Sequence, residues 1–223
     1  MSYGIMIIGE SGTGKTSSLR NLSPANTLLI QAIKKPLPFR SSWRIVSKEA
    51  PDGNIIVSDQ SAHIIGAMQK TKREIIIIDD FQYILSNEYM RRSEERGFDK
   101  FSDIGRHAWD ILDAIGDLSG NKRTYVMAHS TTDESGKTKA KTIGKLLDEK
   151  ITIEGMFSIV LRTVVSNGNY LFATKNSGSD TVKSPIGLFG DEFIDNDIAS
   201  VDNEICEYYG LREPAQKAAR LNF

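Results

Sequence analysis

The sequence predicts an α/β fold in which a mostly parallel sheet is flanked by helices and continues into an antiparallel edge near the C-terminus. The main observation is a set of short apolar runs that suit buried parallel strands: Ile5 to Ile8, Thr27 to Ile30, Ile55 to Val57, Ile75 to Ile78 and Thr124 to Ala128. Helix-like segments separate most of these runs, which predicts helices on both faces of the sheet. Two later apolar runs, 156–165 and 170–173, are joined across Asn167-Gly168, a hairpin signal that predicts the antiparallel edge.

Apolar residues at helical spacing predict the helices. One such pattern follows Ser61, a candidate N-cap, and a second runs over 104–115. A third runs over 198–208 and precedes Gly210, which is a plausible C-terminal stop. A further helix-like segment, Thr16 to Leu22, directly follows the first turn of the chain.

Length and composition limit the classes of protein to which the chain can belong. The chain has 223 residues, of which 39% are hydrophobic and 26% charged, and no apolar run approaches the roughly 20 residues of a membrane helix. We expect one domain over 1–223, with 213–223 as a flexible tail. A single cysteine, Cys206, and an N-terminus that enters the first apolar run directly predict a cytoplasmic protein. The net charge of −1 means that any nucleic-acid binding needs a local basic patch.

The first apolar run is followed by the pattern of a phosphate-binding loop, Gly9-x4-Gly14-Lys15-Thr16, in the required position between a strand and a helix-like segment. In such loops backbone N–H groups cradle phosphate oxygens, the lysine reaches the β- and γ-phosphates, and the Thr hydroxyl binds Mg²⁺. The residues predicted to bind ATP are Gly9, Glu10, Ser11, Gly12, Thr13, Gly14, Lys15, Thr16 and Ser17. The alternative is a ligand-free turn, which would not need the Lys-Thr pair at this offset.

Two later strand ends carry polar residues that suit the same site. Asp79 and Asp80 end the run Ile75 to Ile78; Asp79 is the predicted second Mg²⁺ residue, and Asp80 the residue that orients or deprotonates the attacking water. Their alternative role is to cap the next helix. His129 and Ser130 end the fifth run and are candidates for sensing the γ-phosphate, because open α/β sheets bind ligands at this edge. A purely structural histidine is the alternative there.

The combination GESGTGKT, IIIIDD and YVMAHS, with Lys183-Ser184-Pro185 later in the chain, resembles the small phage-encoded AAA-type ATP-binding proteins with a RecA-like core. Some members of that group are single-strand-annealing recombination ATPases. The resemblance covers roughly Tyr3 to Phe189, and its most specific part is the phosphate-binding loop. It implies a RecA-like ATPase that assembles into rings or filaments, with ATP between neighbours and single-stranded DNA along the inner surface, in the host cytoplasm if phage-encoded.

The same resemblance implies that the loops after the fourth and fifth strands face DNA. These would be Ser86 to Arg106 and Thr131 to Lys150, and their basic residues are Arg91, Arg92, Arg96, Lys100, Lys137, Lys139, Lys141 and Lys145. Both stretches also contain acids, so ordinary solvated loops are the alternative. The segment Lys137 to Lys141 is the better candidate, because its alternation would place three ammonium groups on one face of an extended chain.

Two catalytic features remain open. The resemblance suggests a positive residue donated across a subunit boundary, with Lys183 and Arg162 as candidates and a surface salt bridge as the alternative. RecA-type enzymes also place a catalytic Glu at the end of the strand after the P-loop helix, whereas this chain has Gln31 there. Gln can position water but cannot accept its proton, so either Asp80 supplies the base or turnover is slow.

These observations predict an ATP-hydrolysing, DNA-binding protein of phage recombination or replication, with ATP and Mg²⁺ as cofactors and ATP as an assembly switch. The expected partners are further copies of the chain, single-stranded DNA and other phage replication or recombination proteins. A nucleotide or small-molecule kinase is one alternative, although 131–150 lacks the arginines usual in a kinase lid. A non-catalytic, ATP-gated scaffold is the other.

Overall fold

The computed structural model describes residues 2–143 and 151–211. Within these residues nine strands form one sheet in the order β3-β2-β4-β5-β1-β7-β8-β9, and β6 pairs with β5. The strands are β1 (Tyr3–Gly9), β2 (Thr27–Gln31), β3 (Ile55–Val57), β4 (Ile75–Asp79), β5 (Arg123–Thr132), β6 (Thr138–Ala140), β7 (Ile159–Ser166), β8 (Asn169–Ala173) and β9 (Phe193–Asp195).

The first five strands and β7 are parallel, whereas β6, β8 and β9 run antiparallel to their neighbours. All five predicted parallel strands therefore exist, and the antiparallel C-terminal edge is confirmed. The predicted hairpin joins β7 to β8, and its two turn residues have positive φ, 51° at Asn167 and 78° at Gly168. This is the conformation that an Asn-Gly hairpin turn requires. The fold class predicted from the sequence is correct.

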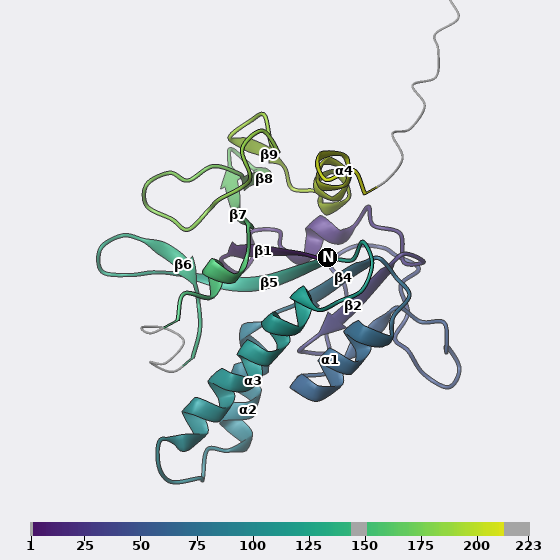
Figure 1. Cartoon of the computed structure of the whole chain (residues 1–223), viewed down its shortest axis with the longest axis vertical. Helices are drawn as coiled ribbons and strands as arrows, with labels where there is room; N and C mark the ends of the chain where they lie inside the picture. The colour runs from purple at the N-terminus through teal and green to yellow at the C-terminus, as the bar shows by residue number, and fades with distance from the viewer. Residues whose placement is uncertain (1, 144–150, 212–223) are drawn as a thin grey trace, which may run out of the picture.

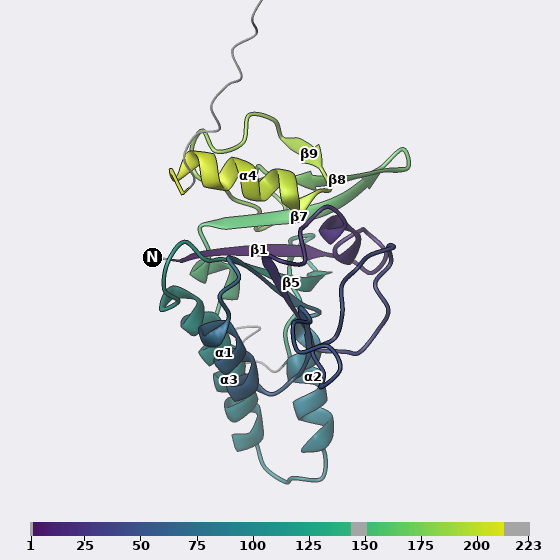
Figure 2. The ribbon, with the colours of Figure 1, turned by 90° about the vertical axis from the view of Figure 1, so that its right-hand side faces the viewer.

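Helices cover both faces of the sheet (Figures 1 and 2). They are α1 (Ser61–Lys70), α2 (Gln82–Arg91), α3 (Asp99–Gly116) and α4 (Ile198–Tyr208), with single 3-10 turns η1 (Thr16–Leu19) and η3 (Ile153–Met156). In Figure 2, α1, α2 and α3 lie on one side of the sheet and α4 on the other. Alternate strand residues face alternate layers. Met6 and Ile8 of β1 therefore pack with the α1–α3 side, and Ile5 and Ile7 with η1 and α4.

A buried charged network fixes α4 to the sheet. The Arg123 guanidinium in β5 donates from Nε and Nη2 to the two carboxylate oxygens of Asp202 in α4, each at 2.9 Å. The Tyr125 hydroxyl donates to the same carboxylate at 2.8 Å. All three side chains are almost fully buried, and paired geometry of this kind offsets the cost of burying the charges.

Three expectations about helices and loops need correction. Ser86 to Arg106 is not a loop: α2 and α3 form a helical arm through most of it, because Tyr89 stacks on Phe101 at 5.6 Å between ring centroids. The predicted helix Thr16 to Leu22 is one 3-10 turn, η1, since the Ser18 hydroxyl donates to the Lys15 carbonyl and competes with helical bonding. Gln60, not Ser61, is the N-cap of α1.

Several predicted features fall outside the described residues. These are the tail 213–223 and the end of the second predicted DNA-facing segment, 144–150, which includes Lys145. No helix in 2–143 or 151–211 has both the length and the apolar character needed to cross a membrane. The parallel core brings the carboxyl ends of β1, β4 and β5 to one edge of the sheet, where the predicted site residues follow them.

Candidate functional site

The predicted phosphate-binding loop connects β1 to η1. Gly12 and Gly14 have φ of +80° and +95°, values that side chains with a Cβ rarely adopt. The Lys15 side chain folds back over the loop, and its Nζ donates to the carbonyls of Gly9 and Glu10, both at 2.7 Å. The Lys15 amine is therefore held at the centre of the loop.

The Lys15 amine is largely removed from solvent, with 6% of the residue exposed. Burial lowers its pKa to about 8, although the carboxylates of Asp80 and Asp79 oppose that effect. Burial disfavours the charged form, and a nearby anion favours it. A polyanion bound at this loop would therefore be stabilised by the lysine charge and would raise the pKa of the amine again.

The loop is packed tightly against β7. A Cβ built on Gly9 would lie 1.8 Å from the Thr163 hydroxyl oxygen, so only glycine fits at this position. That hydroxyl lies 2.6 Å from the Thr13 hydroxyl, which in turn donates to the Glu10 carbonyl at 2.8 Å. Strand β7 thus braces the loop from the side opposite β5.

The two predicted metal residues meet in the structure although they are 63 positions apart. The Thr16 hydroxyl donates to Asp79, at 3.0 Å to Oδ2 and 3.3 Å to Oδ1. Asp79 is fully buried; its burial, and then the neighbouring Asp80, raise its pKa, while Lys35 and Thr16 oppose the rise. One hydroxyl and one carboxylate fit Mg²⁺, which prefers oxygen ligands and usually takes the rest from water and substrate phosphates.

The described residues contain no cluster of three or more His, Cys, Asp or Glu side chains that could enclose a metal by themselves. Thr16 and Asp79 are the residues that would hold the ion.

Lys35, which was not among the residues predicted for the site, lies beside both acids. Its Nζ is hydrogen-bonded to Asp80 and lies 3.8 Å from Oδ2 of Asp79. Asp80 itself has a left-handed backbone, with φ of +60°, which is uncommon for a residue other than glycine. The signal available in the sequence was the position of Lys35, shortly after β2, whose carboxyl end meets that of β4.

His129 lies on the other side of Asp80, with 3.7 Å between its Nε2 and Oδ1 of Asp80. Burial lowers the pKa of His129, and the nearby Lys15 adds to the effect, so the imidazole is neutral at pH 7. The predicted partner at the next position, Ser130, lies where β5 pairs with Ala140 of β6. Between these two residues, the one that reaches the predicted phosphate site is His129.

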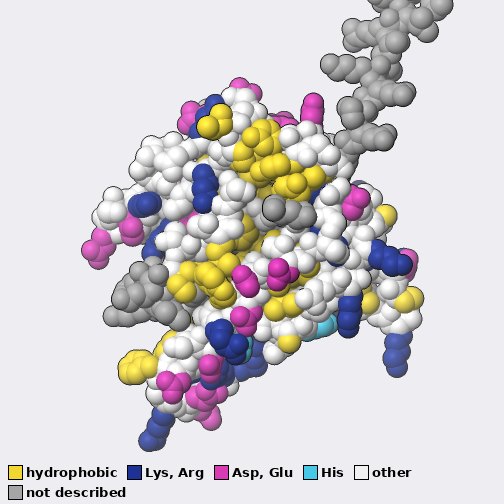
Figure 3. Space-filling model, viewed as in Figure 1, with side chains coloured by type: hydrophobic (Ala, Val, Ile, Leu, Met, Phe, Trp, Pro, Cys, Tyr) yellow, Lys and Arg dark blue, Asp and Glu magenta, His cyan; other side chains and the backbone are white. Residues whose placement is uncertain are grey.

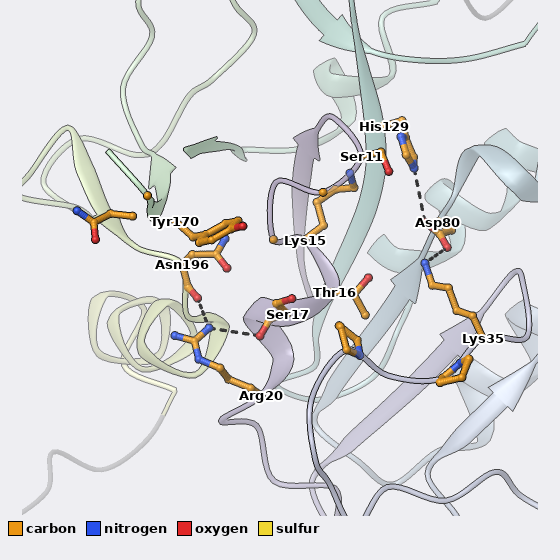
Figure 4. A pocket seen from close by; sticks show the side chains of 16 residues that line it. Ser11, Lys15, Thr16, Ser17, Arg20, Lys35, Asp80, His129, Tyr170 and Asn196 are labelled. Atoms are coloured by element: carbon orange, nitrogen blue, oxygen red, sulfur yellow. Dashed lines mark hydrogen bonds and ion pairs between the residues drawn. The ribbon is translucent and has the colours of Figure 1, made fainter. Parts of the chain in front are cut away.

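These groups line a cavity of about 720 Å³ (Figure 4). Lys35, Asp80 and His129 form one end, and Lys15 and Thr16 lie in the middle. The other end contains Arg20, Tyr170 and Asn196, together with Gly168 and Asn169 of the β7–β8 turn. Tyr170 and Asn196 were not predicted, because nothing in the sequence shows that residues so much later in the chain return to the loop.

Three predicted catalytic residues lie away from this cavity. Gln31 is buried, and its Nε2 donates to the Lys35 carbonyl at 3.3 Å, so it supports the segment that carries Lys35. Arg162 is paired with Asp180, with 3.3 Å from Nη2 to Oδ2. Lys183 forms a backbone bridge with Val160. Among the described residues, the cavity lining includes none of the three. That Arg162 or Lys183 supplies a positive charge to the site of a neighbouring subunit stays a prediction.

Three of the predicted DNA-facing basic residues in the helical arm, Arg91, Arg92 and Lys100, have intramolecular partners. Arg91 pairs with Asp59 at 2.6 Å, and Arg92 bonds with Glu88, Glu95 and Asp103. The Lys100 amine donates to three backbone carbonyls in the turn between α2 and α3, and only 8% of Lys100 is exposed. Figure 3 shows basic and acidic side chains close together over this arm.

The second predicted DNA-facing segment is partly extended, as expected. Strand β6 covers Thr138–Ala140 and pairs with the end of β5. Lys137 and Lys141 flank it, and their backbones bond to Asp133 and His129 respectively. This ribbon, with Lys139 at its centre, therefore adjoins the strand that carries His129.

Comparison with known proteins adds little to this geometry. No protein-family model and no curated protein matches the chain. Among solved structures, the chain is similar to the KaiC-like protein PH0186 from the hyperthermophilic archaeon Pyrococcus horikoshii OT3, with 11% sequence identity, a TM-score of 0.48, and coverage of 77% of this chain and 78% of that one. A likeness of this size transfers no functional property.

Proposed function

We propose that this protein binds ATP with Mg²⁺ at the loop 9–16 and hydrolyses it to ADP and phosphate. The main support for this proposal is the hydrogen bond between Thr16 and Asp79 beside the buried Lys15 amine. Thr16 follows β1 and Asp79 ends β4, and β5 lies between these two strands. A fold that joins a phosphate-binding loop to a carboxylate two strands away suits a metal-bound triphosphate.

Each residue has a defined task in this proposal. The loop N–H groups and Lys15 bind the phosphates, and Thr16 and Asp79 hold the metal ion, which would neutralise charge on the β- and γ-phosphates. Asp80 orients the attacking water and accepts its proton, while His129 lies beside it at the γ-phosphate end. Lys35 positions Asp80 through their hydrogen bond.

One observation favours a second candidate function, a non-catalytic ATP-gated scaffold. Gln31 replaces an acid, and the remaining candidate base, Asp80, is engaged by the Lys35 ammonium. The hydrogen bond from Lys35 occupies an oxygen of the carboxylate that would otherwise be free to contact the attacking water. Tight ATP binding with very slow turnover would identify this scaffold.

The wider biological role also belongs to the proposal. We place the protein in phage DNA recombination or replication in the host cytoplasm, as an assembly of several copies that binds single-stranded DNA. The ribbon Lys137 to Lys141 is the favoured DNA contact, because it is extended and adjoins the strand of His129. Arg91, Arg92 and Lys100 are weaker candidates, because each already has partners in its own chain.

Phosphate release from Mg·ATP tests this function. We expect wild type to release phosphate faster when single-stranded DNA is added at low salt, Asp80→Asn to bind ATP but release little phosphate, and Lys15→Ala to fail at binding. If Asp80→Asn hydrolysed ATP as fast as wild type, the proposed role of Asp80 would be contradicted. If the rate of phosphate release did not depend on DNA, the proposed DNA binding would be contradicted, but the proposed ATPase activity would not.

A further inference from the structure

The cavity extends well beyond the groups that would bind phosphate and metal. Lys35, Asp80 and His129 mark the end near the γ-phosphate, and Lys15 and Thr16 mark the middle. A nucleotide placed with its terminal phosphate at Asp80 must direct its nucleoside toward the opposite end. Figure 4 shows Tyr170 and Asn196 at that end, beside the loop.

Hydrogen bonds hold this opposite end in place. The Asn196 backbone N–H donates to the Tyr170 carbonyl at 3.2 Å, and Arg20 Nη1 donates to the Asn196 carbonyl at 2.6 Å. A Cβ on Gly14 would lie 2.9 Å from the Tyr170 ring and 3.0 Å from Asn196 Oδ1. Both side chains therefore lie directly against the phosphate-binding loop.

Two features at Tyr170 and Asn196 would be unfavourable if these residues served only to stabilise the fold. Asn196 is only 3% exposed, yet its Nδ2 has no hydrogen-bond partner among the described residues, and a buried unpaired donor costs free energy. Tyr170 lines the cavity, and half of the residue is exposed. Together they suit a ligand that has both a flat aromatic face and a hydrogen-bond acceptor.

We propose that Tyr170 and Asn196 form the nucleobase subsite of the cavity and select adenine over guanine, an inference that rests on the proposed binding of a nucleoside triphosphate. The Tyr170 ring stacks on the base, as aromatic side chains do on every base. The Asn196 amide pairs with adenine, donating from Nδ2 to N7 and accepting at Oδ1 from the N6 amino group. Guanine has two acceptors, O6 and N7, at that edge and leaves Oδ1 without a donor.

The test compares three probes that share the phosphates and differ in the base: Mg·ATP, Mg·GTP and Mg·tripolyphosphate. We expect Tyr170→Ala to weaken ATP binding about tenfold and to leave tripolyphosphate binding unchanged, with Tyr170→Phe close to wild type. Asn196→Ala should remove a preference of about tenfold for ATP over GTP. Tyr208→Ala is the matched control, because Tyr208 is a similarly exposed tyrosine outside the cavity.

The outcomes separate this inference from the proposed function. The inference would be overturned if the two alanine variants bound ATP as tightly as wild type. It would also be overturned if each variant lost the same affinity for ATP and for tripolyphosphate, because both residues would then only support the loop. Wild-type protein that binds none of the three probes would overturn the proposed function and the inference with it. Melting temperatures of the variants, compared with Tyr208→Ala, show whether each one is folded.

Discussion

At the residue scale, Lys35 sets the charge balance at the end of the cavity that contains Asp80 and His129. Asp79 and Asp80 are both buried, and their carboxylates repel each other. The Lys35 ammonium lies against both, and the two acids outweigh the effect of its partial burial and raise its pKa. A divalent ion held by Asp79 would therefore compete with Lys35 for the same negative charge.

Replacing Lys35 tests this competition. We expect Lys35→Ala to tighten Mg²⁺ binding without nucleotide at least about fivefold, because a unit charge 4 Å away contributes about 1 kcal/mol even in water. Calorimetric titration with Mg²⁺ measures the effect. Lys34→Ala is the control, since Lys34 is exposed and adjacent in sequence. Equal Mg²⁺ affinity in wild type and Lys35→Ala would contradict this account of Lys35.

The contact between Gly9 and Thr163 gives a second prediction at this scale. Gly9→Ala should lower the free energy of unfolding by about 1–3 kcal/mol, the usual range for overpacking, because the new Cβ meets the Thr163 hydroxyl. The free energies of unfolding in urea of wild type, the two single variants and the double variant measure this effect. Adding Thr163→Ala should recover part of the loss, whereas strictly additive effects would show that the two sites do not touch.

At the element scale, the loop before α1 is tied to α2 through Asp59. Partial burial by itself raises the pKa of Asp59, but hydrogen bonds from Arg91, Asn87 and Gln60 outweigh it and hold the pKa below its usual 3.8. A lowered pKa in the folded state contributes stability above the unfolded value, and that stability is lost as the pH falls through the folded value.

We therefore expect Asp59→Asn to be less stable than wild type at pH 7, by about 1 kcal/mol or less because Arg91 is 45% exposed. The difference should shrink as the pH falls below about 3.8. Urea unfolding at pH 7 and pH 3 measures it. Asp52→Asn breaks a more exposed pair with Arg44 and should change stability less. A deficit of the same size at both pH values would exclude the ion pair as its cause.

Strands were easier to predict than the segments between them. Runs such as Ile75 to Ile78 are apolar at every position, so burial on both faces and a central place in the sheet follow from local sequence. The arm of α2 and α3 was missed in part because its turn depends on Lys100 bonding to carbonyls, a tertiary contact within a charged stretch. Helix η1 ends early because Ser18 bonds to the backbone, which apolar spacing does not reveal.

At the scale of the whole molecule, the site combines local and distant parts. The loop 9–16 and the Thr16–Asp79 pair follow from a motif whose strand context is visible in the sequence. The end of the cavity that contains Tyr170 and Asn196 depends on β7, β8 and the corner before α4, which reach the loop only because β7 pairs with β1. Sequence reasoning therefore predicted that Lys15, Thr16 and Asp79 belong to one site, where the structure brings them together, and missed Lys35, Tyr170 and Asn196 of the adjoining cavity.

We propose that this fold binds a metal-bound triphosphate at the loop after β1. Calorimetric titration of Mg·ATP into wild-type protein and into Lys15→Ala tests this binding without any assumption about turnover or DNA. We expect a saturable heat with wild type, little or none with Lys15→Ala at the same melting temperature, and weaker binding when EDTA removes Mg²⁺. Wild-type protein that is folded and gives no binding heat, or a Lys15→Ala variant that binds equally well, would contradict the claim.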